Sequence, residues 1–274
     1  KALKLKNDFR LGYGSYNLLA SAPFYYPQII PIKIYLEKNP NLDIVCSWEH
    51  TIDHNGKRIR DWQTEIKNYG EFLGPVLLGL CPVWHPSIAF RTKAMINAGG
   101  FDPTYTRAED FEVTARMAIK RYNAAIVPEF LLLQREHNNR QSILYEGIQR
   151  DVNQKIQKNA LQFFLKHDLI NEFASFLRIE DVPGIKRDKI QLLEYNKILE
   201  KLFEEVKVKQ NLTNHEMETL KIIFVKRIGY GIIYCQYFRF LPNILFKLCF
   251  NILSPLSNPT IRKPLIKLYH RIFH

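Results

Sequence analysis

The sequence has 274 residues, of which 46% are hydrophobic and 24% charged, so it can bury a core and form one or two domains. Its four cysteines form no C-x-x-C pair, and we therefore expect reduced thiols in a cytoplasmic protein, with neither a zinc site nor a disulfide framework. The formal net charge is +12, and much of that charge lies in the C-terminal tail.

The first elements that the pattern predicts are a helix, a strand and a hairpin. An apolar helix follows Tyr25-Tyr26-Pro27. Residues 44–48 form an apolar run that predicts a strand, and Asp53-His54-Asn55-Gly56 predicts the turn into the next strand. Residues 68–80 then predict a helix or a loop that brings Trp84 toward a cleft.

The stretch from His85 to Asp110 is the most informative part of the sequence. Residues 88–90 predict a buried strand, because this apolar run is short and follows a proline and a serine. Thr92 is expected to cap a short helix over residues 93–98. Gly99-Gly100 would end that helix, because glycine adopts the left-handed conformation without steric cost.

An acidic pair, Glu109-Asp110, opens the next predicted helix. Thr106 stands three residues before Glu109, which is the spacing of a capping box, in which a hydroxyl and a carboxylate bind free backbone amides. Such a pair more often caps and solvates a helix than performs catalysis. The residues alone therefore leave a structural and a catalytic role open.

Helices dominate the second half of the sequence. Residues 123–128 predict one more strand, but strand-like runs end near Tyr145. Residues 151–167 and 188–206 have apolar residues at spacings of three and four, which is typical of amphipathic helices. The predicted divisions are a domain over residues 1–145, a helical extension over 146–218 and a basic amphipathic tail over 219–274.

The tail has a distinct composition. After Glu218 it contains nine Lys and Arg residues and no acidic residue, with aromatic and aliphatic residues between them. Its apolar runs are shorter than the roughly 18 to 20 residues that span a bilayer. An amphipathic helix on an anionic membrane surface fits this pattern, and burial against the domain is the alternative. The abundance of Leu, Ile and Phe disfavours nucleic acid as a partner.

Three motifs in a fixed order resemble the acceptor half of family-2-type glycosyltransferases with the GT-A fold. They are His85-Pro86-Ser87, Gly99-Gly100-Phe101-Asp102 and Glu109-Asp110. The resemblance extends from about Gly14 to about Ser142. It implies an α/β fold with a partial GT-A-like mixed sheet flanked by helices, followed by a mainly α-helical C-terminal region.

The resemblance also implies roles for individual residues. In that family the aspartate of the Glu-Asp pair is the usual general base, which takes the proton from an acceptor hydroxyl as it attacks a nucleotide sugar. Here that residue is Asp110. The other implied positions are acceptor-binding Trp84, His85 and Glu109, and, near the diphosphate or a metal, Arg135 and His137.

The implied reaction is the transfer of one sugar, because the Gln-Arg-x-x-Arg-Trp sequence of processive members lacks its tryptophan here. The resemblance implies an inverting enzyme that uses a nucleotide-sugar donor and a glycan or lipid-linked acceptor. We expect it to act in polysaccharide or cell-envelope glycan synthesis, in the cytoplasm and at the inner face of the membrane.

Two features depart from the family pattern. A GT-A domain begins with a βαβαβ unit that binds the nucleotide, and the residues before Tyr16 are too few for such a unit. We therefore expect either a fragment or a partner chain that supplies this half. The family also places an Asp-x-Asp motif, which binds Mg²⁺ or Mn²⁺, where residues 19–24 contain no acid. The metal ligands are thus unknown.

Two interpretations follow from these departures. Arg135 would stabilise the leaving phosphate without a metal, through charge-assisted hydrogen bonds. Alternatively, the chain is a degenerate, non-catalytic module that binds an acceptor, a membrane surface or a partner transferase.

Overall fold

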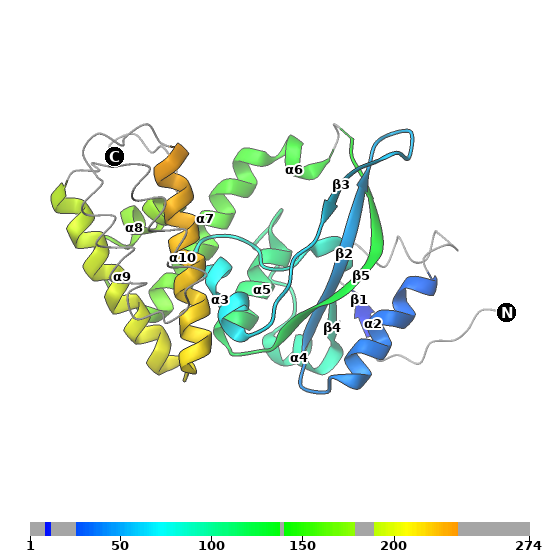
Figure 1. The fold of residues 1–274 in the computed structure, drawn as a ribbon, viewed down its shortest axis with the longest axis horizontal. Helices are drawn as coiled ribbons and strands as arrows, with labels where there is room; N and C mark the ends of the chain where they lie inside the picture. The colour runs from blue at the N-terminus through cyan, green and yellow to red at the C-terminus, as the bar shows by residue number, and fades with distance from the viewer. Residues whose placement is uncertain (1–8, 12–25, 138–139, 179–188, 235–274) are drawn as a thin grey trace, which may run out of the picture. The chain divides into compact units, whose positions relative to one another are not determined.

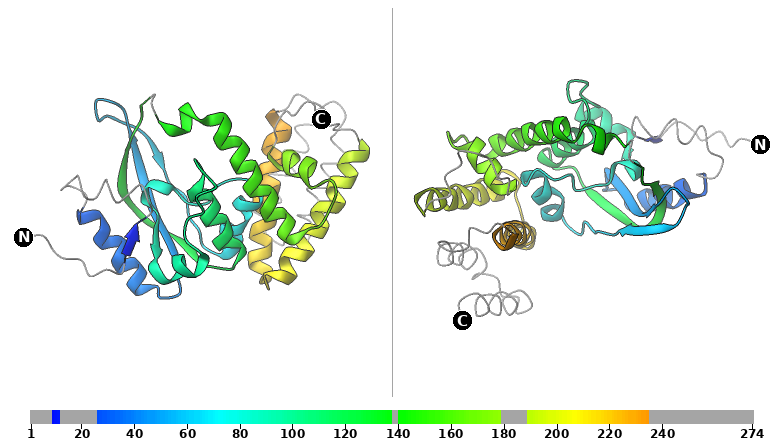
Figure 2. Two further views of the ribbon diagram at one scale, coloured as in Figure 1. Left: turned by 180° about the vertical axis from the view of Figure 1, so that it is seen from behind. Right: turned by 90° about the horizontal axis from the view of Figure 1, so that it is seen from above.

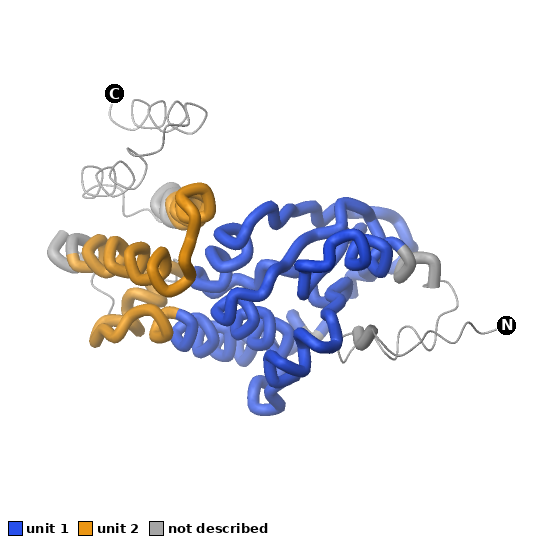
Figure 3. Tube along the Cα trace, turned by 90° about the horizontal axis from the view of Figure 1, so that it is seen from below, with its two compact units in different colours: residues 1–160 blue, residues 161–274 orange. Residues whose placement is uncertain are grey.

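The computed structural model describes residues 9–11, 26–137, 140–178 and 189–234 (Figure 1). The chain divides into two compact units, residues 1–160 and residues 161–274 (Figure 3). The first unit contains a mixed sheet with helices on both faces. The second is helical in its described part.

The sheet of the first unit is organised around one central strand. The described residues form five strands, β1 (Phe9–Leu11), β2 (Ile44–Ile52), β3 (Arg58–Trp62), β4 (Ala89–Arg91) and β5 (Ala124–Arg135). Strand β5 runs parallel to β2 and pairs with it along its whole length. Strands β4 and β3 are both antiparallel to β2 and share its other edge, β4 at the start of β2 and β3 at its end.

A serine hydroxyl fills the gap that β3 and β4 leave on the edge of β2. The backbone N–H of Ser47 donates to Ser87 Oγ at 3.1 Å, and the same hydroxyl lies 3.2 Å from the Ser47 carbonyl oxygen. Ser87 ends the 3₁₀ helix η1 (His85–Ser87). The side chain of Ser87 therefore replaces a strand neighbour and fixes η1 against the sheet.

Helices cover both faces of this sheet. The helices of the first unit are α2 (Tyr26–Lys38), α3 (Tyr69–Leu77), α4 (Thr92–Ala98), α5 (Glu109–Ile119), α6 (Gln141–Leu144) and α7 (Glu146–Phe164), the last of which continues into the second unit. Figure 1 and Figure 2 show α2 on one face and α3 and α5 on the other. Under α2, a core cluster joins Ile32 and Leu36 to Val45, Ala89 and Val127 of three strands.

Most of the predicted elements of the first unit are confirmed. The hairpin turn forms as expected, because Gly56 takes a φ of 85° and the Asp53 carboxylate accepts hydrogen bonds from the N–H groups of Asn55 and Lys57 at 2.9 Å. The α/β class, the mixed sheet flanked by helices and the helical C-terminal region are also confirmed. The likeness to a GT-A fold stays a prediction.

Both predicted helix caps in this region are wrong. Helix α4 begins at Thr92 itself, so Arg91 is its N-cap residue. Helix α5 begins at Glu109 with Ala108 at the N-cap and no side-chain cap, because Arg107 takes a φ of 76° and separates Thr106 from the helix. A capping box does occur elsewhere: Thr213 Oγ1 accepts from the Glu216 N–H at 3.2 Å, and the Glu216 carboxylate accepts from the Thr213 N–H at 2.9 Å.

The second unit is built from amphipathic helices. They are the end of α7 and the helices α8 (Ile170–Arg178), α9 (Lys189–Lys209) and α10 (Asn214–Tyr234). The predicted apolar face of α9 is confirmed, because Tyr195, Leu199, Leu202 and Val206 are all buried. Among the described residues, no helix is long and apolar enough to cross a membrane. Most of the predicted tail, residues 235–274, lies outside the described residues.

Candidate functional site

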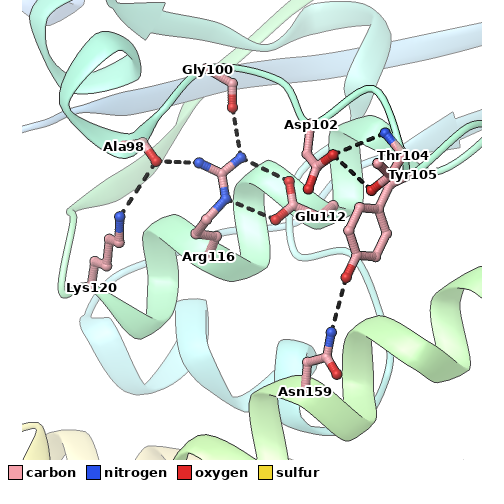
Figure 4. A network of polar contacts seen from close by, with 9 residues as sticks. All are labelled: Ala98, Gly100, Asp102, Thr104, Tyr105, Glu112, Arg116, Lys120 and Asn159. Atoms are coloured by element: carbon pink, nitrogen blue, oxygen red, sulfur yellow. Dashed lines mark hydrogen bonds and ion pairs between the residues drawn. The ribbon is translucent and has the colours of Figure 1, made fainter.

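The Gly-Gly turn before α5 is held by one arginine (Figure 4). Arg116 donates through Nη1 to the Ala98 carbonyl and through Nη2 to the Gly100 carbonyl, the latter at 2.6 Å. Its Nε and Nη2 also donate to the two carboxylate oxygens of Glu112, each at 2.8 Å. The end of α4 is thus joined to the second turn of α5 through a single guanidinium group.

Glycine is required in this turn for two reasons. Gly99 and Gly100 have φ angles of 101° and 68°, in the left-handed region that other residues rarely adopt. In addition, a Cβ on Gly99 would lie 3.2 Å from Arg116 Nη1, whereas a Cβ on Gly100 would meet nothing within 4 Å. The missing side chain of Gly99 therefore makes room for the guanidinium.

The loop between this turn and α5 is also held by side chains. The Asp102 carboxylate accepts from the Thr104 N–H at 2.9 Å and from its hydroxyl at 2.7 Å, and these bonds lower the pKa of Asp102. The Tyr105 hydroxyl accepts from Asn159 at 3.0 Å (Figure 4), and the Arg107 guanidinium lies 3.8 Å from the centre of the Tyr145 ring. These contacts fix where α5 begins.

Asp110 stands in the first turn of α5. Burial raises the pKa of Asp110 above its ordinary value, and the negative charge of Glu109 adds to this effect. The charge of His85 and the backbone N–H groups of Asp110 and Phe111 act in the opposite direction and lower the pKa. The fold therefore brings His85 and Asp110, two residues singled out from the sequence, close enough for the charge of His85 to act on the Asp110 carboxyl. Glu109 is the neighbour of Asp110 in the chain and acts on the same carboxyl.

A thiol lies within electrostatic reach of Asp110. The residue Cys81 is exposed as a whole, and its thiol donates to the Val83 carbonyl oxygen at 3.2 Å. Burial and the charge of Asp110 both raise the pKa of the Cys81 thiol. Burial likewise raises the pKa of Cys46 to about 12. Both thiols are therefore neutral at physiological pH, which makes them poor nucleophiles.

Trp84 forms an aromatic pair beside His85. It is the N-cap residue of η1, and its ring lies 5.3 Å from the ring of Trp62 on β3. In the ladder between β2 and β3, Trp62 lies opposite Glu49. The third tryptophan, Trp48, donates its indole N–H to the Thr64 carbonyl at 2.9 Å and packs against Phe130, which is a structural role.

Glu49 is a site residue that the sequence did not reveal. Its side chain is 1% exposed, and within the described residues its Oε2 atom has no hydrogen-bond partner. Burial raises the pKa of Glu49 to about 7, although the Trp84 side chain and the charges of Arg60 and Arg140 oppose this shift. The signal in the sequence was a strand in which the polar residues Ser47, Glu49 and Thr51 alternate with other residues.

The two residues expected near a diphosphate lie at the end of β5 and just after it. Arg135 Nη1 donates to the carbonyl groups of Asp53 and His54 at 2.7 and 2.8 Å, so its guanidinium supports the hairpin turn. His137 is exposed at the end of β5. In the described ranges, no contact links either residue to Asp110, and their roles stay predictions. The arginines whose charges act on Glu49 are Arg60 and Arg140, not Arg135.

No metal site emerges from the described residues. In them, no group of three or more His, Cys, Asp or Glu side chains is placed to hold a metal ion. The segment where the resembled family carries its Asp-x-Asp motif, residues 19–24, lies outside the described residues. The described residues therefore offer no ligand set for a metal, and a divalent metal stays an expectation from the resemblance.

Comparison with known proteins gives one informative similarity. Over 104 residues the chain is 28% identical to an uncharacterized glycosyltransferase of Methanocaldococcus jannaschii. The matched stretch is 38% of this chain and 35% of that relative, so the chain spans about a third of the relative's length. No family model matches the sequence, and no solved structure matches it significantly.

The contact between Gly99 and Arg116 is testable by substitution. Gly99→Ala and Gly100→Ala each place a Cβ at positive φ, which costs roughly 1 to 2 kcal/mol. Only Gly99→Ala also displaces the guanidinium, and we expect it to lower the free energy of unfolding by about 1 kcal/mol more. Urea denaturation measures both variants. In an Arg116→Ala background the two glycine substitutions should lower the free energy of unfolding by equal amounts. A difference that persists in that background would show that Arg116 is not its cause.

The raised pKa of Glu49 makes stability depend on pH. Between pH 4.5 and about 7 the native state keeps a proton that the unfolded state has released. The free energy of unfolding should therefore fall as pH rises through this range, by at most about 1.4 kcal/mol per pH unit. Glu49→Gln should flatten this dependence. Glu129→Gln, which changes an exposed glutamate of β5, is the control and should leave the slope unchanged; equal slopes in all three proteins would refute the assignment.

Proposed function

We propose that this chain is part of a glycosyltransferase and that Asp110 is its general base. The observation that carries the proposal is the environment of Asp110, a partly buried carboxyl at a helix start whose pKa is raised by burial and lowered by His85. A base of this kind has to be ionised, yet basic enough to take a proton from a hydroxyl. The similarity to a protein named as a glycosyltransferase supports the same reaction class.

In the proposed reaction, Asp110 accepts the hydroxyl proton of the acceptor. The oxygen of that hydroxyl forms a bond to the anomeric carbon of the donor sugar as the bond from this carbon to the diphosphate breaks. The leaving nucleoside diphosphate keeps the bonding electrons, and the neutral Asp110 later releases its proton to water. Because attack and departure occur on opposite sides of the carbon, the anomeric configuration inverts.

The acceptor side of the proposed site consists of Trp84, His85 and Glu109. The Trp84 and Trp62 rings offer an apolar surface, which suits the C–H face of a sugar ring. His85 and Glu109 flank Asp110 electrostatically and offer hydrogen-bonding groups to hydroxyls. We infer that the acceptor is a glycan or lipid-linked sugar, that a single sugar is transferred, and that a nucleotide sugar is the donor.

The remaining partners are also proposals. Arg135 and His137 are assigned to the donor diphosphate only by the sequence resemblance. A divalent metal, a partner chain that binds the nucleotide, and an anionic membrane surface have the same status.

The proposal is tested by replacing the base. Asp110→Asn keeps the size of the side chain but removes its basicity, so nucleoside diphosphate release should fall by about 10² to 10⁴-fold. Wild-type activity should increase with pH as Asp110 loses its proton. The measurement uses the full-length gene product, a panel of nucleotide sugars and candidate glycan and lipid-linked acceptors.

Asp151→Asn, an exposed replacement of the same chemistry on α7, is the matched control and should keep wild-type activity. Full activity in Asp110→Asn would exclude this residue as the base. If no donor is consumed by the wild-type protein, the chain acts instead as a non-catalytic binding module.

A further inference from the structure

One face of β2 is both polar and buried. Ser47, Glu49 and Thr51 occupy alternate positions of the strand and are 0%, 1% and 0% exposed. The Ser47 hydroxyl donates to the Trp48 carbonyl oxygen at 3.2 Å, but Glu49 Oε2 and Thr51 Oγ1 have no hydrogen-bond partner in the part of the chain that the structure describes. A buried carboxylate oxygen without a partner is costly, and such groups in native proteins usually have a functional reason.

A matching donor lies next to this carboxyl. Trp84 Nε1 is also buried and, among the described residues, also lacks a hydrogen-bond partner. The Trp84 side chain is near enough to lower the pKa of Glu49, but the two groups do not reach the geometry of a normal hydrogen bond. Trp62 lies next to both groups, because it is opposite Glu49 in the ladder between β2 and β3 and packs its ring against the ring of Trp84.

Several charged groups surround Glu49. Arg60 acts on it from β3 and Arg140 from the start of α6. Glu136, at the end of β5, binds Arg140 at 2.7 Å and lies 3.9 Å from Arg60, so it competes for both cations. The titratable residue that follows Trp84 in the chain is His85. Glu49 is therefore attracted by two arginines that are already partly neutralised.

We propose that Glu49 is a positioning residue, whose carboxylate takes the Trp84 indole N–H as a hydrogen-bond donor and so sets the place of Trp84 and of the η1 turn that carries His85. The Trp84 indole N–H suits this role, because it is a hydrogen-bond donor only and does not titrate. An ionised carboxylate is the stronger acceptor, because charge-assisted hydrogen bonds are about twice as strong as neutral ones. The position of the Trp84 ring thus depends on whether Glu49 is ionised.

The consequence for catalysis rests on the proposed function. If Trp84 and His85 bind the acceptor, the ionised form of Glu49 presents them correctly and the protonated form does not. Acceptor binding should then weaken as pH falls below about 7, the pKa to which burial raises Glu49. The effect should be on the KM for the acceptor more than on kcat, because Glu49 does not touch the reacting atoms.

The direct test follows the tryptophans themselves. The chain contains three, Trp48, Trp62 and Trp84, so incorporation of 5-fluorotryptophan gives three fluorine resonances that Trp→Phe variants can assign. We expect the Trp84 resonance to shift with a midpoint near pH 7 in the full chain. Glu49→Gln keeps an acceptor oxygen but cannot ionise, and it should abolish this shift. His85 remains in that variant, so a shift caused by His85 would survive.

Trp48 provides the matched reference, because its indole N–H is already bound to the Thr64 carbonyl. Its resonance should not follow the same transition. A Trp84 resonance that does not titrate in the wild type, or one that titrates equally in Glu49→Gln, would overturn the proposal. Where transfer activity is detected, Glu49→Gln should also make the acceptor KM independent of pH between 6 and 8. Failure of the transferase proposal would leave the fluorine result unaffected, so the two are distinguishable.

Discussion

The candidate site depends on the guanidinium group of Arg116. It binds the carbonyl groups of Ala98 and Gly100 on one side and the Glu112 carboxylate on the other. The pKa of Arg116 is raised by Glu112, so the pair stays charged, and removal of either partner would leave a half-buried charge unpaired. Because Arg116 lies in the same helix as Asp110, its bonds to Ala98 and Gly100 fix α5 relative to the end of α4, and Glu112 orients the guanidinium.

The parts of this arrangement that follow from backbone chemistry could be predicted from the sequence. Gly99 marks the end of α4 because a φ of 101° favours glycine, and Gly56 marks the hairpin for the same reason. The helix caps could not be predicted so well. Thr106 and Glu109 have the spacing of a capping box, but the left-handed residue Arg107 between them prevents it. The same spacing forms a true box at Thr213, where the helix begins directly after the threonine.

The burial of Glu49 could not be predicted from the sequence pattern of its strand. Polar residues at alternate positions of a strand usually face solvent, yet Ser47, Glu49 and Thr51 do not. They are buried because η1 lies against this edge of β2 through Ser87 and because Trp84 and Trp62 pack near Glu49. Ser87 lies 40 residues along the chain from Ser47, and no local sequence period reveals a contact at that separation. The result is a second buried carboxyl in the same unit as Asp110, with a pKa that is also raised by burial.

Asp110 and His85 form one electrostatic unit around a partly buried carboxyl. Carbon-13 NMR titration of the aspartate carboxyls, with Asp110→Asn used for assignment, measures this interaction. We expect Asp110 to titrate above its ordinary pKa of 3.8 and His85→Asn to raise its pKa further, because the charge of His85 lowers it in the wild type. An Asp110 pKa at or below 3.8 that does not respond to His85→Asn would show that burial and His85 do not act on this carboxyl.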